Sequence, residues 1–433
     1  MKTKELYRVF LDSSGVTTDS RVTSPGKIFF ALQGEKFDGN AFARQAIDNG
    51  CSMAVIDNAD FVVPRQTILV SNVLSSLQQL ACYHRQLFRI PVLAITGSNG
   101  KTTTKELVRE ILSCRYRTLA TRGNLNNHIG VPLTLLELNE THQIAVIEMG
   151  ANHIGEIETL CTIAMPDHGL ITNIGSAHLE GFGSPEGVRK AKSELFRYLK
   201  RTGGKAFLNS DRPNLVELSE EISLDFIPYG TGEENFVAGS LLASDEKLEL
   251  EIKTRKFSKS LNVKTQMAGT YNVENIIAAA CIGVYFGASP GQIKDAVENY
   301  IPSSNRSQIT ATKKNKLLLD AYNANPDSMM AAIINFAAMP GENKSVILGD
   351  MLELGQYSTR EHEKIIRMVD RYDFREVMLV GKVFYDIPAA GSYLNFKNTE
   401  QLTEWLTDNP VSGRFILLKG SRGIGLENCS GAL

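Results

Sequence analysis

One glycine-rich stretch decides the fold class of this chain: Thr96-Gly97-Ser98-Asn99-Gly100-Lys101-Thr102-Thr103. An apolar run, residues 91–95, precedes it, and apolar residues recur at helical spacing over residues 107–112. The pattern predicts a buried strand, a tight turn and a helix start, where backbone N–H groups converge on phosphate oxygens. We expect a nucleoside triphosphate site in which Lys101 reaches the β- and γ-phosphates and Thr102 holds Mg²⁺. The alternative is a strand-to-helix turn without a ligand.

Composition narrows the class of protein. The 433 residues, 43% of them hydrophobic and 22% charged, suggest about three domains of roughly 150 residues each. A formal net charge of −2 argues against nucleic acid or an anionic membrane as a partner. The N-terminus lacks an apolar signal core, and no apolar stretch approaches the ~20 residues of a membrane span. We therefore expect a cytoplasmic protein that acts on small molecules and is not inserted into a membrane. A monomer is also expected, although composition does not decide the oligomeric state.

Strand and helix patterns alternate along the whole chain, which predicts an α/β fold in three domains. Residues 1–88 are expected to form a small N-terminal α/β domain. Residues 89–303 should form a central parallel sheet of the P-loop ATPase type. Turn-forming residues gather at 302–305, after which residues 304–433 should form a Rossmann-like C-terminal domain.

Polar residues follow two of the predicted central strands, where ligands gather in open α/β sheets. Glu148 comes directly after the apolar run 143–147, where its carboxylate could be a further Mg²⁺ ligand, or simply a solvated side chain at a strand end. His178 follows the strand predicted at 169–172. It could ligate a metal or orient a phosphate, although a single histidine is also common as a structural group.

Lys192 lies within a helix predicted over residues 185–199, on the face that carries its apolar residues. A lysine held in an apolar interior loses proton affinity and can react as a neutral amine. Carbon dioxide would then convert it into a carbamate, an anionic metal ligand. Alternatively, its ammonium group extends to the surface while the stem stays buried.

Four further segments are rich in polar and turn-forming residues, and each could be a ligand contact or only a loop. The first is the amide-rich segment 121–132. The other three follow predicted strands in the last third of the chain: residues 320–329, 349–355 and 419–423. Three polar strand ends in one domain suggest a second ligand-binding edge that faces the first.

Seven strings of residues span the chain: TGSNGKTT, GNLNNHIGVPLTLL, EMGANHIGEI, ITNIGSAHLEGFGS, DAYNANPDSM, LGDMLELG and KGSRG. Together they resemble the Mur ligase family, whose form of the phosphate loop also fits the short glycine spacing. The resemblance implies an ATP- and Mg²⁺-dependent ligase of peptidoglycan precursor synthesis, and thus a role in cell-wall formation, cell shape and division. DAYNANPDSM and LGDMLELG imply that D-alanyl-D-alanine is added to UDP-N-acetylmuramoyl-tripeptide. The alternatives are another Mur-type or folylpolyglutamate synthetase-like ligase, or a P-loop nucleotide switch.

The resemblance also implies roles for individual residues. Catalytic roles are implied for Lys101, Glu148, His178 and Lys192. Metal ligation is implied for Thr102, Glu148, His178 and Lys192, the last as a carbamate. ATP contacts are implied for Gly97, Ser98, Asn99, Gly100, Lys101, Thr102, Thr103, Asn275, Arg306, Asp320, Asn323 and Asn325. Substrate contacts are implied for Ser20, Arg21, Asn124, Asn126, Asn127, Ser328, Asp350, Lys419, Ser421 and Arg422.

Overall fold

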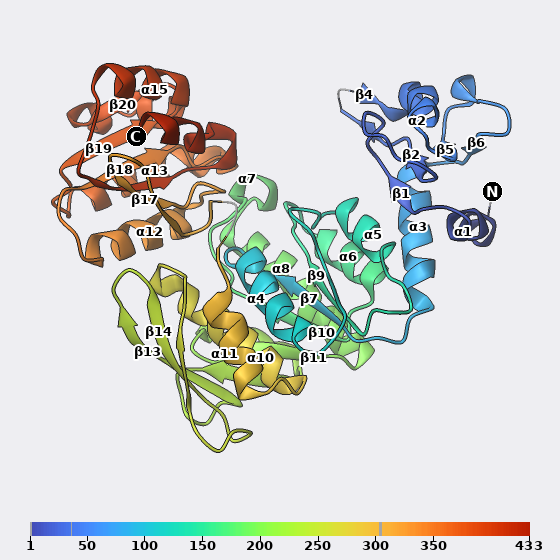
Figure 1. Cartoon of the computed structure of the whole chain (residues 1–433), viewed down its shortest axis with the longest axis horizontal. Helices are drawn as coiled ribbons and strands as arrows, with labels where there is room; N and C mark the ends of the chain where they lie inside the picture. The colour runs from blue at the N-terminus through green and yellow to red at the C-terminus, as the bar shows by residue number, and fades with distance from the viewer. Residues whose placement is uncertain (1, 36, 303–304) are drawn as a thin grey trace.

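The computed structural model describes residues 2–35, 37–302 and 305–433. The strands of these residues form four sheets, three of them with covering helices, so the predicted α/β class is confirmed. The N-terminal part lies at one end of the molecule and the C-terminal part at the other (Figure 1). The domain boundary predicted between residues 303 and 304 falls outside the described residues. No helix in the described part of the chain is long and apolar enough to cross a membrane.

The N-terminal part is a four-stranded parallel sheet of order β1-β2-β5-β6. Alternate residues of β2 face opposite sides, so Phe29 packs with α2 whereas Phe30 packs with α1 and α3. The strands are β1 (Val16–Thr17), β2 (Ile28–Phe30), β5 (Met53–Ile56) and β6 (Thr67–Leu69), with a small hairpin of β3 (Gln33–Gly34) and β4 (Phe37–Asp38). The helices are α1 (Thr3–Leu11), η1 (Gly39–Phe42), α2 (Ala43–Asp48), η2 (Ala59–Phe61) and α3 (Val73–Gln86).

The central sheet has nine strands in the order β15-β14-β13-β12-β11-β10-β7-β9-β8. It is parallel from β13 to β8, whereas β14 and β15 extend it as an antiparallel edge that the sequence analysis did not foresee. The strands are β7 (Val92–Thr96), β8 (Thr118–Ala120), β9 (Ile144–Glu148), β10 (His168–Ile171), β11 (Lys205–Asn209), β12 (Phe226–Gly230), β13 (Val237–Ser244), β14 (Leu248–Lys253) and β15 (Leu261–Lys264).

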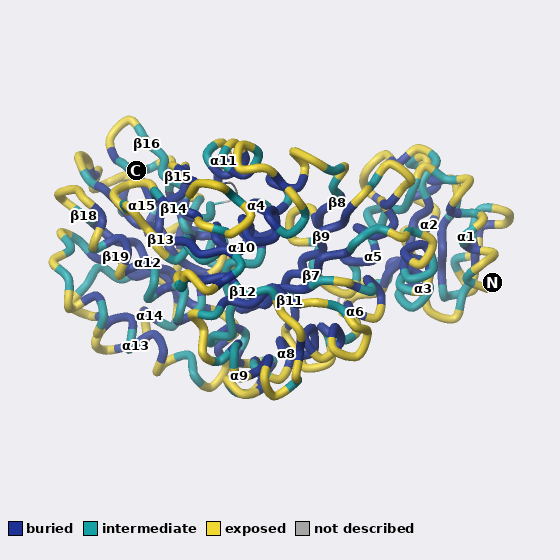
Figure 2. Tube along the Cα trace, turned by 90° about the horizontal axis from the view of Figure 1, so that it is seen from below, coloured by how far each residue is buried: buried dark blue, intermediate teal, exposed yellow. Residues whose placement is uncertain are grey.

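Helices cover both faces of the central sheet, which explains why β7 is apolar at every position before Thr96. Leu93 and Ile95 pack toward α4 and α10, whereas Val92 and Ala94 belong to the core that contains α8. Figure 2 shows α4 and α10 on one side of the buried central strands and α8 on the other. The helices are α4 (Lys101–Ser113), α5 (Gly130–Leu135), α6 (Glu156–Ala164), α7 (Leu179–Phe182), α8 (Pro185–Thr202), α9 (Pro213–Ile222), η3 (Thr270–Asn272), α10 (Val273–Tyr285) and α11 (Pro290–Asn299).

The C-terminal sheet has the order β16-β17-β21-β18-β19-β20, and only β16 runs antiparallel to its neighbour. The last of these strands along the chain, β21, therefore lies between β17 and β18. The strands are β16 (Gln308–Ala311), β17 (Lys316–Leu319), β18 (Lys344–Gly349), β19 (Glu376–Val380), β20 (Leu394–Phe396) and β21 (Phe415–Lys419). The helices are α12 (Pro326–Ala338), η4 (Gly355–Tyr357), α13 (Ser358–Val369), α14 (Lys382–Asp386), η5 (Pro388–Ser392), α15 (Thr399–Asp408), η6 (Arg422–Ile424) and η7 (Leu426–Ala432).

Candidate active site

A cavity of about 1320 Å³ lies where the carboxyl ends of the central strands face the C-terminal sheet. Loops after β7, β9 and β10 line it on the central side, and the segment from Asp320 to α12 lines it on the other. Parallel strands present polar loops at their carboxyl ends, which is why residues distant in sequence converge here. The cavity is large enough for a nucleotide together with a second substrate.

Two glycines give the loop after β7 its shape. Gly97 has a φ of 144°, and a Cβ atom there would lie 2.0 Å from the Thr172 hydroxyl oxygen. Gly100 has a φ of 79° at the start of α4, and a Cβ atom there would lie 2.4 Å from Asn275 Oδ1. Any larger residue would clash and be strained at both positions, so the loop requires glycine. The loop and the N-terminus of α4 thus form a concave set of backbone N–H groups suited to an anion.

Lys101 begins α4 and folds back over the loop. Its Nζ donates to the carbonyl oxygens of Gly97 at 2.6 Å and Ser98 at 3.2 Å. Burial lowers the pKa of Lys101, and the positive charge of Arg306 lowers it further, whereas Glu148 opposes the shift. These hydrogen bonds place the Lys101 ammonium group between the loop and the polar residues of the cavity. A phosphate bound at the loop would contact it there.

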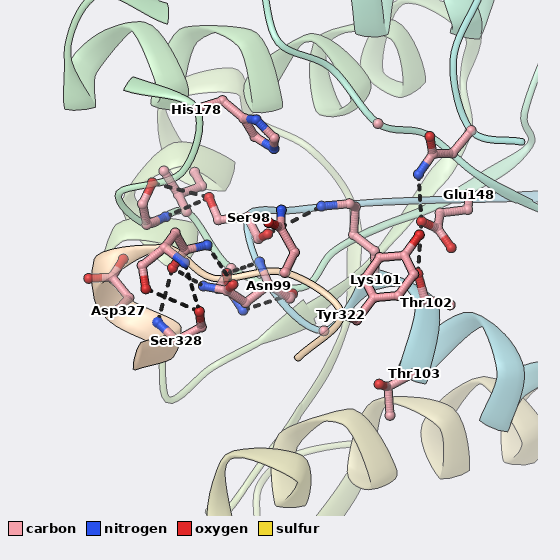
Figure 3. Close-up of a pocket in the computed structure, with 18 of the residues that line it drawn as sticks. Ser98, Asn99, Lys101, Thr102, Thr103, Glu148, His178, Tyr322, Asp327 and Ser328 are labelled. Carbon is pink, nitrogen blue, oxygen red and sulfur yellow. Dashed lines mark hydrogen bonds between the residues drawn. The ribbon is translucent and has the colours of Figure 1, made fainter. Parts of the chain in front are cut away.

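Glu148 is buried at the end of β9 with one carboxylate oxygen satisfied and the other not. Oε1 accepts hydrogen bonds from Thr102 Oγ1 at 3.0 Å and Asn126 Nδ2 at 2.8 Å (Figure 3). Oε2 is buried without a hydrogen-bond partner. A buried, unpaired carboxylate oxygen is costly unless a cation neutralises it, and carboxylate with hydroxyl oxygen is the donor set that Mg²⁺ prefers. These residues therefore fit a magnesium ion.

His178 stands in the left-handed region, with a φ of 53°, immediately before α7. Its Nδ1 lies 2.5 Å from Glu353 Oε2, although the contact lacks the angle of a hydrogen bond. The interaction with His178 lowers the pKa of Glu353, more than partial burial of the carboxyl raises it. The two residues come from opposite sides of the cavity and both line it.

Lys192 is only 1% exposed, so the alternative in which its ammonium group extends to the surface is wrong. Its Nζ lies 5.3 Å from the centre of the Phe182 ring, behind the cavity wall rather than on it. Burial lowers the pKa of Lys192 to about 7, with a further contribution from the charge of Lys101. Glu156 and Glu194 oppose this shift. The lowered pKa makes the neutral amine of Lys192 available near neutral pH.

The amide Asn275, from α10, lies directly behind the glycine loop. Its Oδ1 accepts from Thr104 Oγ1 at 3.1 Å, and its Nδ2 donates to Asn272 at 2.9 Å. The neighbouring Tyr271 shares a hydrogen bond of 2.8 Å with Ser307, and burial raises its pKa well above the usual value. This contact joins the central part of the chain to the C-terminal part at the edge of the cavity.

Three residues of the C-terminal part hold charge at the cavity. Buried Lys419, the last residue of β21, forms an ion pair of 2.7 Å with half-buried Asp320, which directly follows β17. The Arg306 guanidinium lies 3.6 Å from the centre of the Tyr322 ring, and its buried Nε has no hydrogen-bond partner. An unpaired buried guanidinium N–H is a donor available to an anionic or carbonyl oxygen.

The first turn of α12 meets the glycine loop across the cavity. Asn325 Nδ2 donates to Asn99 Oδ1 at 2.8 Å, and Asn325 also caps α12 through the Ser328 backbone N–H. Asp327 Oδ2 accepts from the Ser176 backbone N–H at 2.6 Å. These contacts dock the C-terminal part onto the central part (Figure 3).

The structure brings most of the predicted site residues to one cavity. Those on its lining are Ser98, Asn99, Gly100, Lys101, Thr102, Thr103, Asn124, Asn126, Asn127, Glu148, His178, Asn275, Arg306, Asp320, Asn323, Asn325, Ser328 and Lys419. Among the polar lining residues that sequence reasoning did not assign to the site are Tyr322, Asp327 and Glu353. All three lie inside the strings DAYNANPDSM and LGDMLELG, so the strings themselves were the signal that could have found them.

Several predicted substrate contacts lie away from this cavity. Asp350 is buried, and its carboxylate accepts from the backbone N–H groups of Val383 and Phe384 at the start of α14. Ser421 bonds the Ala324 carbonyl, and Arg422 lies 5.2 Å from the Tyr322 ring centre. In the N-terminal part, Ser20 bonds Gln45, and exposed Arg21 pairs with Asp19 at 2.8 Å. Their roles as substrate contacts stay predictions.

Comparisons with known proteins agree over the whole length of the chain. Family models for the Mur ligase catalytic, middle and glutamate ligase domains match residues 12–93, 95–283 and 305–422, respectively. The UDP-N-acetylmuramoyl-tripeptide--D-alanyl-D-alanine ligase of Bacillus subtilis (strain 168) is 36% identical over 426 residues, which cover 95% of this chain and 91% of that protein.

Solved structures also match. MurF from Acinetobacter baumannii has a TM-score of 0.88 at 31% identity, covering 99% of this chain and 98% of that one. MurF ligase from Thermotoga maritima in complex with ADP has a TM-score of 0.83 at 26% identity, covering 98% of this chain and 97% of that one. Similarity of this extent establishes a common fold with the same order of parts.

Proposed function

The chain belongs to the Mur ligase family, and from this we propose that it joins D-alanyl-D-alanine to the peptide of UDP-N-acetylmuramoyl-tripeptide at the expense of ATP. A carboxylate is a poor electrophile, so it first takes the γ-phosphoryl group of ATP to become an acyl phosphate. The dipeptide amine then attacks the acyl carbon, and phosphate leaves as the amide bond forms. The reaction consumes one ATP and releases ADP and phosphate for each product.

One observation carries this proposal. The glycine loop and Lys101 line one side of the cavity, and Arg306 and Asp320 line the opposite side. A phosphoryl group bound at the loop would lie between the Lys101 ammonium group and the donors of the C-terminal part. Phosphoryl transfer needs little covalent chemistry from the protein, so positioning and charge stabilisation supply most of the acceleration. Docking of the two parts also excludes water, which would otherwise hydrolyse the acyl phosphate.

Thr102, Glu148, His178 and carbamylated Lys192 are the residues that would hold magnesium. Bound Mg²⁺ neutralises charge on the transferring phosphoryl group. In this chain, the unpaired Glu148 Oε2 supplies the negative charge, and the Thr102 hydroxyl fixes the orientation of that carboxylate. Lys192 contributes as an anion only after its neutral amine forms an N–C bond to carbon dioxide and loses one proton.

In this proposal, each of the three parts of the chain binds a different ligand or part of a ligand. Residues 1–88, with Ser20 and Arg21, bind the UDP-sugar end of the substrate. Residues 89–303 bind ATP through the glycine loop, and residues 304–433 complete the ATP site and receive D-alanyl-D-alanine. Asn124, Asn126 and Asn127 line the central side of the cavity, where amide groups suit a polar peptide.

The proposed reaction is tested by leaving out one substrate at a time. With ATP, Mg²⁺, UDP-N-acetylmuramoyl-tripeptide and D-alanyl-D-alanine present, the protein should release one phosphate per product, heavier than the tripeptide substrate by one dipeptide minus one water. Phosphate release and mass spectrometry measure both quantities. Equal phosphate release without the tripeptide and dipeptide would instead indicate a nucleotide switch.

Carbamate formation at Lys192 should rise with pH, because only the neutral amine reacts with carbon dioxide. With a pKa of about 7, roughly 10% of Lys192 is neutral at pH 6 and roughly 90% at pH 8. At constant dissolved ¹³CO₂, the carbamate ¹³C signal should therefore grow over this range. The exposed Lys190 on the same helix provides the control, since Lys190→Ala should keep the signal and Lys192→Ala should lose it. A signal that survives Lys192→Ala would contradict the assignment.

A further inference from the structure

Two non-glycine residues with left-handed backbone face each other across the cavity. His178 has a φ of 53° and Glu353 a φ of 64°, in a region that side chains rarely adopt. His178 follows β10 of the central sheet, whereas Glu353 follows β18 of the C-terminal sheet. Their side chains meet at 2.5 Å between Nδ1 and Oε2. Strained backbone of this kind persists where surrounding contacts hold it, and it gathers at functional sites.

The surrounding contacts hold both backbones in place. The carbonyl oxygen of His178 accepts from the N–H groups of Gly181 and Phe182, each at 3.1 Å, which begins the short helix α7. The carbonyl oxygen of Glu353 accepts from the Glu180 N–H at 3.1 Å, so the two strained residues are also linked through their own segments. A further hydrogen bond of 3.3 Å joins Tyr357 Oη to the Gly183 carbonyl. The facing geometry is therefore built by both sheets together.

We propose that Glu353, which follows a strand of the C-terminal sheet, is a positioning residue. It orients the imidazole of His178, on the central side of the cavity, so that His178 can bind a cation. Histidines that bind metals usually present their second ring nitrogen to a carboxylate, which fixes the tautomer and raises the basicity of the ring. Glu353 Oε2 is the carboxylate oxygen that faces Nδ1, at 2.5 Å but without the angle of a hydrogen bond, and the other ring nitrogen is then the acceptor that a cation needs. This inference rests on the proposed function, because it assumes the magnesium site.

The consequence is that the cation site is complete only while the C-terminal sheet is docked. Thr102 and Glu148 belong to the central part and meet each other without help from the C-terminal sheet. His178 instead depends on Glu353, which follows β18. In the proposed function, the dipeptide binds to the same C-terminal part that carries Glu353. Docking of this part onto the central part therefore couples dipeptide binding to completion of the cation site.

Mn²⁺ binding to the full chain tests this role without relying on turnover. With a non-hydrolysable ATP analogue present, electron paramagnetic resonance measures the Mn²⁺ affinity of each variant. Glu353→Gln should weaken Mn²⁺ binding by about 10- to 100-fold. Glu353→Gly also removes the carboxylate, so it should bind Mn²⁺ as weakly as Glu353→Gln does. Because glycine adopts the left-handed backbone without strain, this variant should remain folded. Glu186→Gln, an exposed carboxylate on α8, should change the affinity by less than about twofold.

A double variant distinguishes positioning from a general loss of negative charge. If Glu353 acts through His178, Glu353→Gln should cause no further loss in a chain that already carries His178→Gln. Equal affinity of Glu353→Gln and the wild type, or fully additive losses in the double variant, would overturn the inference alone. Absence of Mn²⁺ binding in the wild type would instead refute the cation site of the proposed function, and the inference with it.

Discussion

Replacing Lys192 by alanine should lower the ligation rate by about 10³-fold, because the variant lacks the anion that the carbamate would supply to the metal site. The side chain lies fully inside the helix packing, so its removal leaves a pocket behind the cavity wall. A short carboxylate such as acetate can enter that pocket and replace the carbamate charge. Added acetate should therefore restore part of the rate, measured as product formed per minute by mass spectrometry.

The control for this prediction is Lys190→Ala, which removes an exposed lysine from the same helix. It should keep the wild-type rate and show no response to acetate. Full activity of Lys192→Ala would contradict a metal-binding role. A loss of rate without any rescue, accompanied by a lower melting temperature, would indicate that Lys192 serves packing instead.

Replacing Glu148 by glutamine should reduce kcat by about 10²- to 10³-fold. The amide keeps the size of the side chain and can still accept from Thr102, but it no longer carries the charge at the unpaired Oε2 position. The variant should also require a higher Mg²⁺ concentration for half-maximal rate, since a neutral ligand binds a divalent cation more weakly. Steady-state rates across a Mg²⁺ titration measure both effects.

Two companion variants sharpen this result. Asn126→Ala removes one hydrogen bond to Oε1 but no charge, so its loss should be much smaller. Glu137→Gln, an exposed glutamate, should leave the Mg²⁺ dependence unchanged. An unchanged Mg²⁺ requirement in Glu148→Gln would exclude this carboxylate as a cation ligand.

Local patterns of apolar and polar residues were sufficient to predict the strands that carry the site. The run before Thr96 predicted β7 because it is apolar on both faces, and the same reasoning found β9, β10 and β17. The strands β14 and β15 were missed, although Leu248, Leu250 and Ile252 alternate with charged residues in the pattern of a half-buried strand. Lys192 was placed on the correct face of α8, but periodicity alone could not decide whether its ammonium group was buried.

Contacts between distant parts of the chain were not predictable in the same way. Asp350 and Glu353 lie in one string, and the resemblance implied a substrate contact for Asp350 but none for Glu353. In the structure, Asp350 caps α14, and Glu353 is the residue that reaches the cavity. Which of two nearby carboxylates faces a site depends on the turn between them, here on the left-handed Glu353. Such a turn is set by the sheet docked against it.

The interior place of β21 has a consequence for how the protein is made. β17 and β18 each pair with β21 and not with one another, so the two halves of the sheet stay separate until Phe415–Lys419 has been synthesised. Lys419, the partner of Asp320, arrives on that same strand. During translation, the C-terminal sheet therefore waits with two unpaired strand edges exposed, a state prone to aggregation. A nascent chain that has already folded its nucleotide loop lacks the C-terminal half of the cavity until β21 has been synthesised.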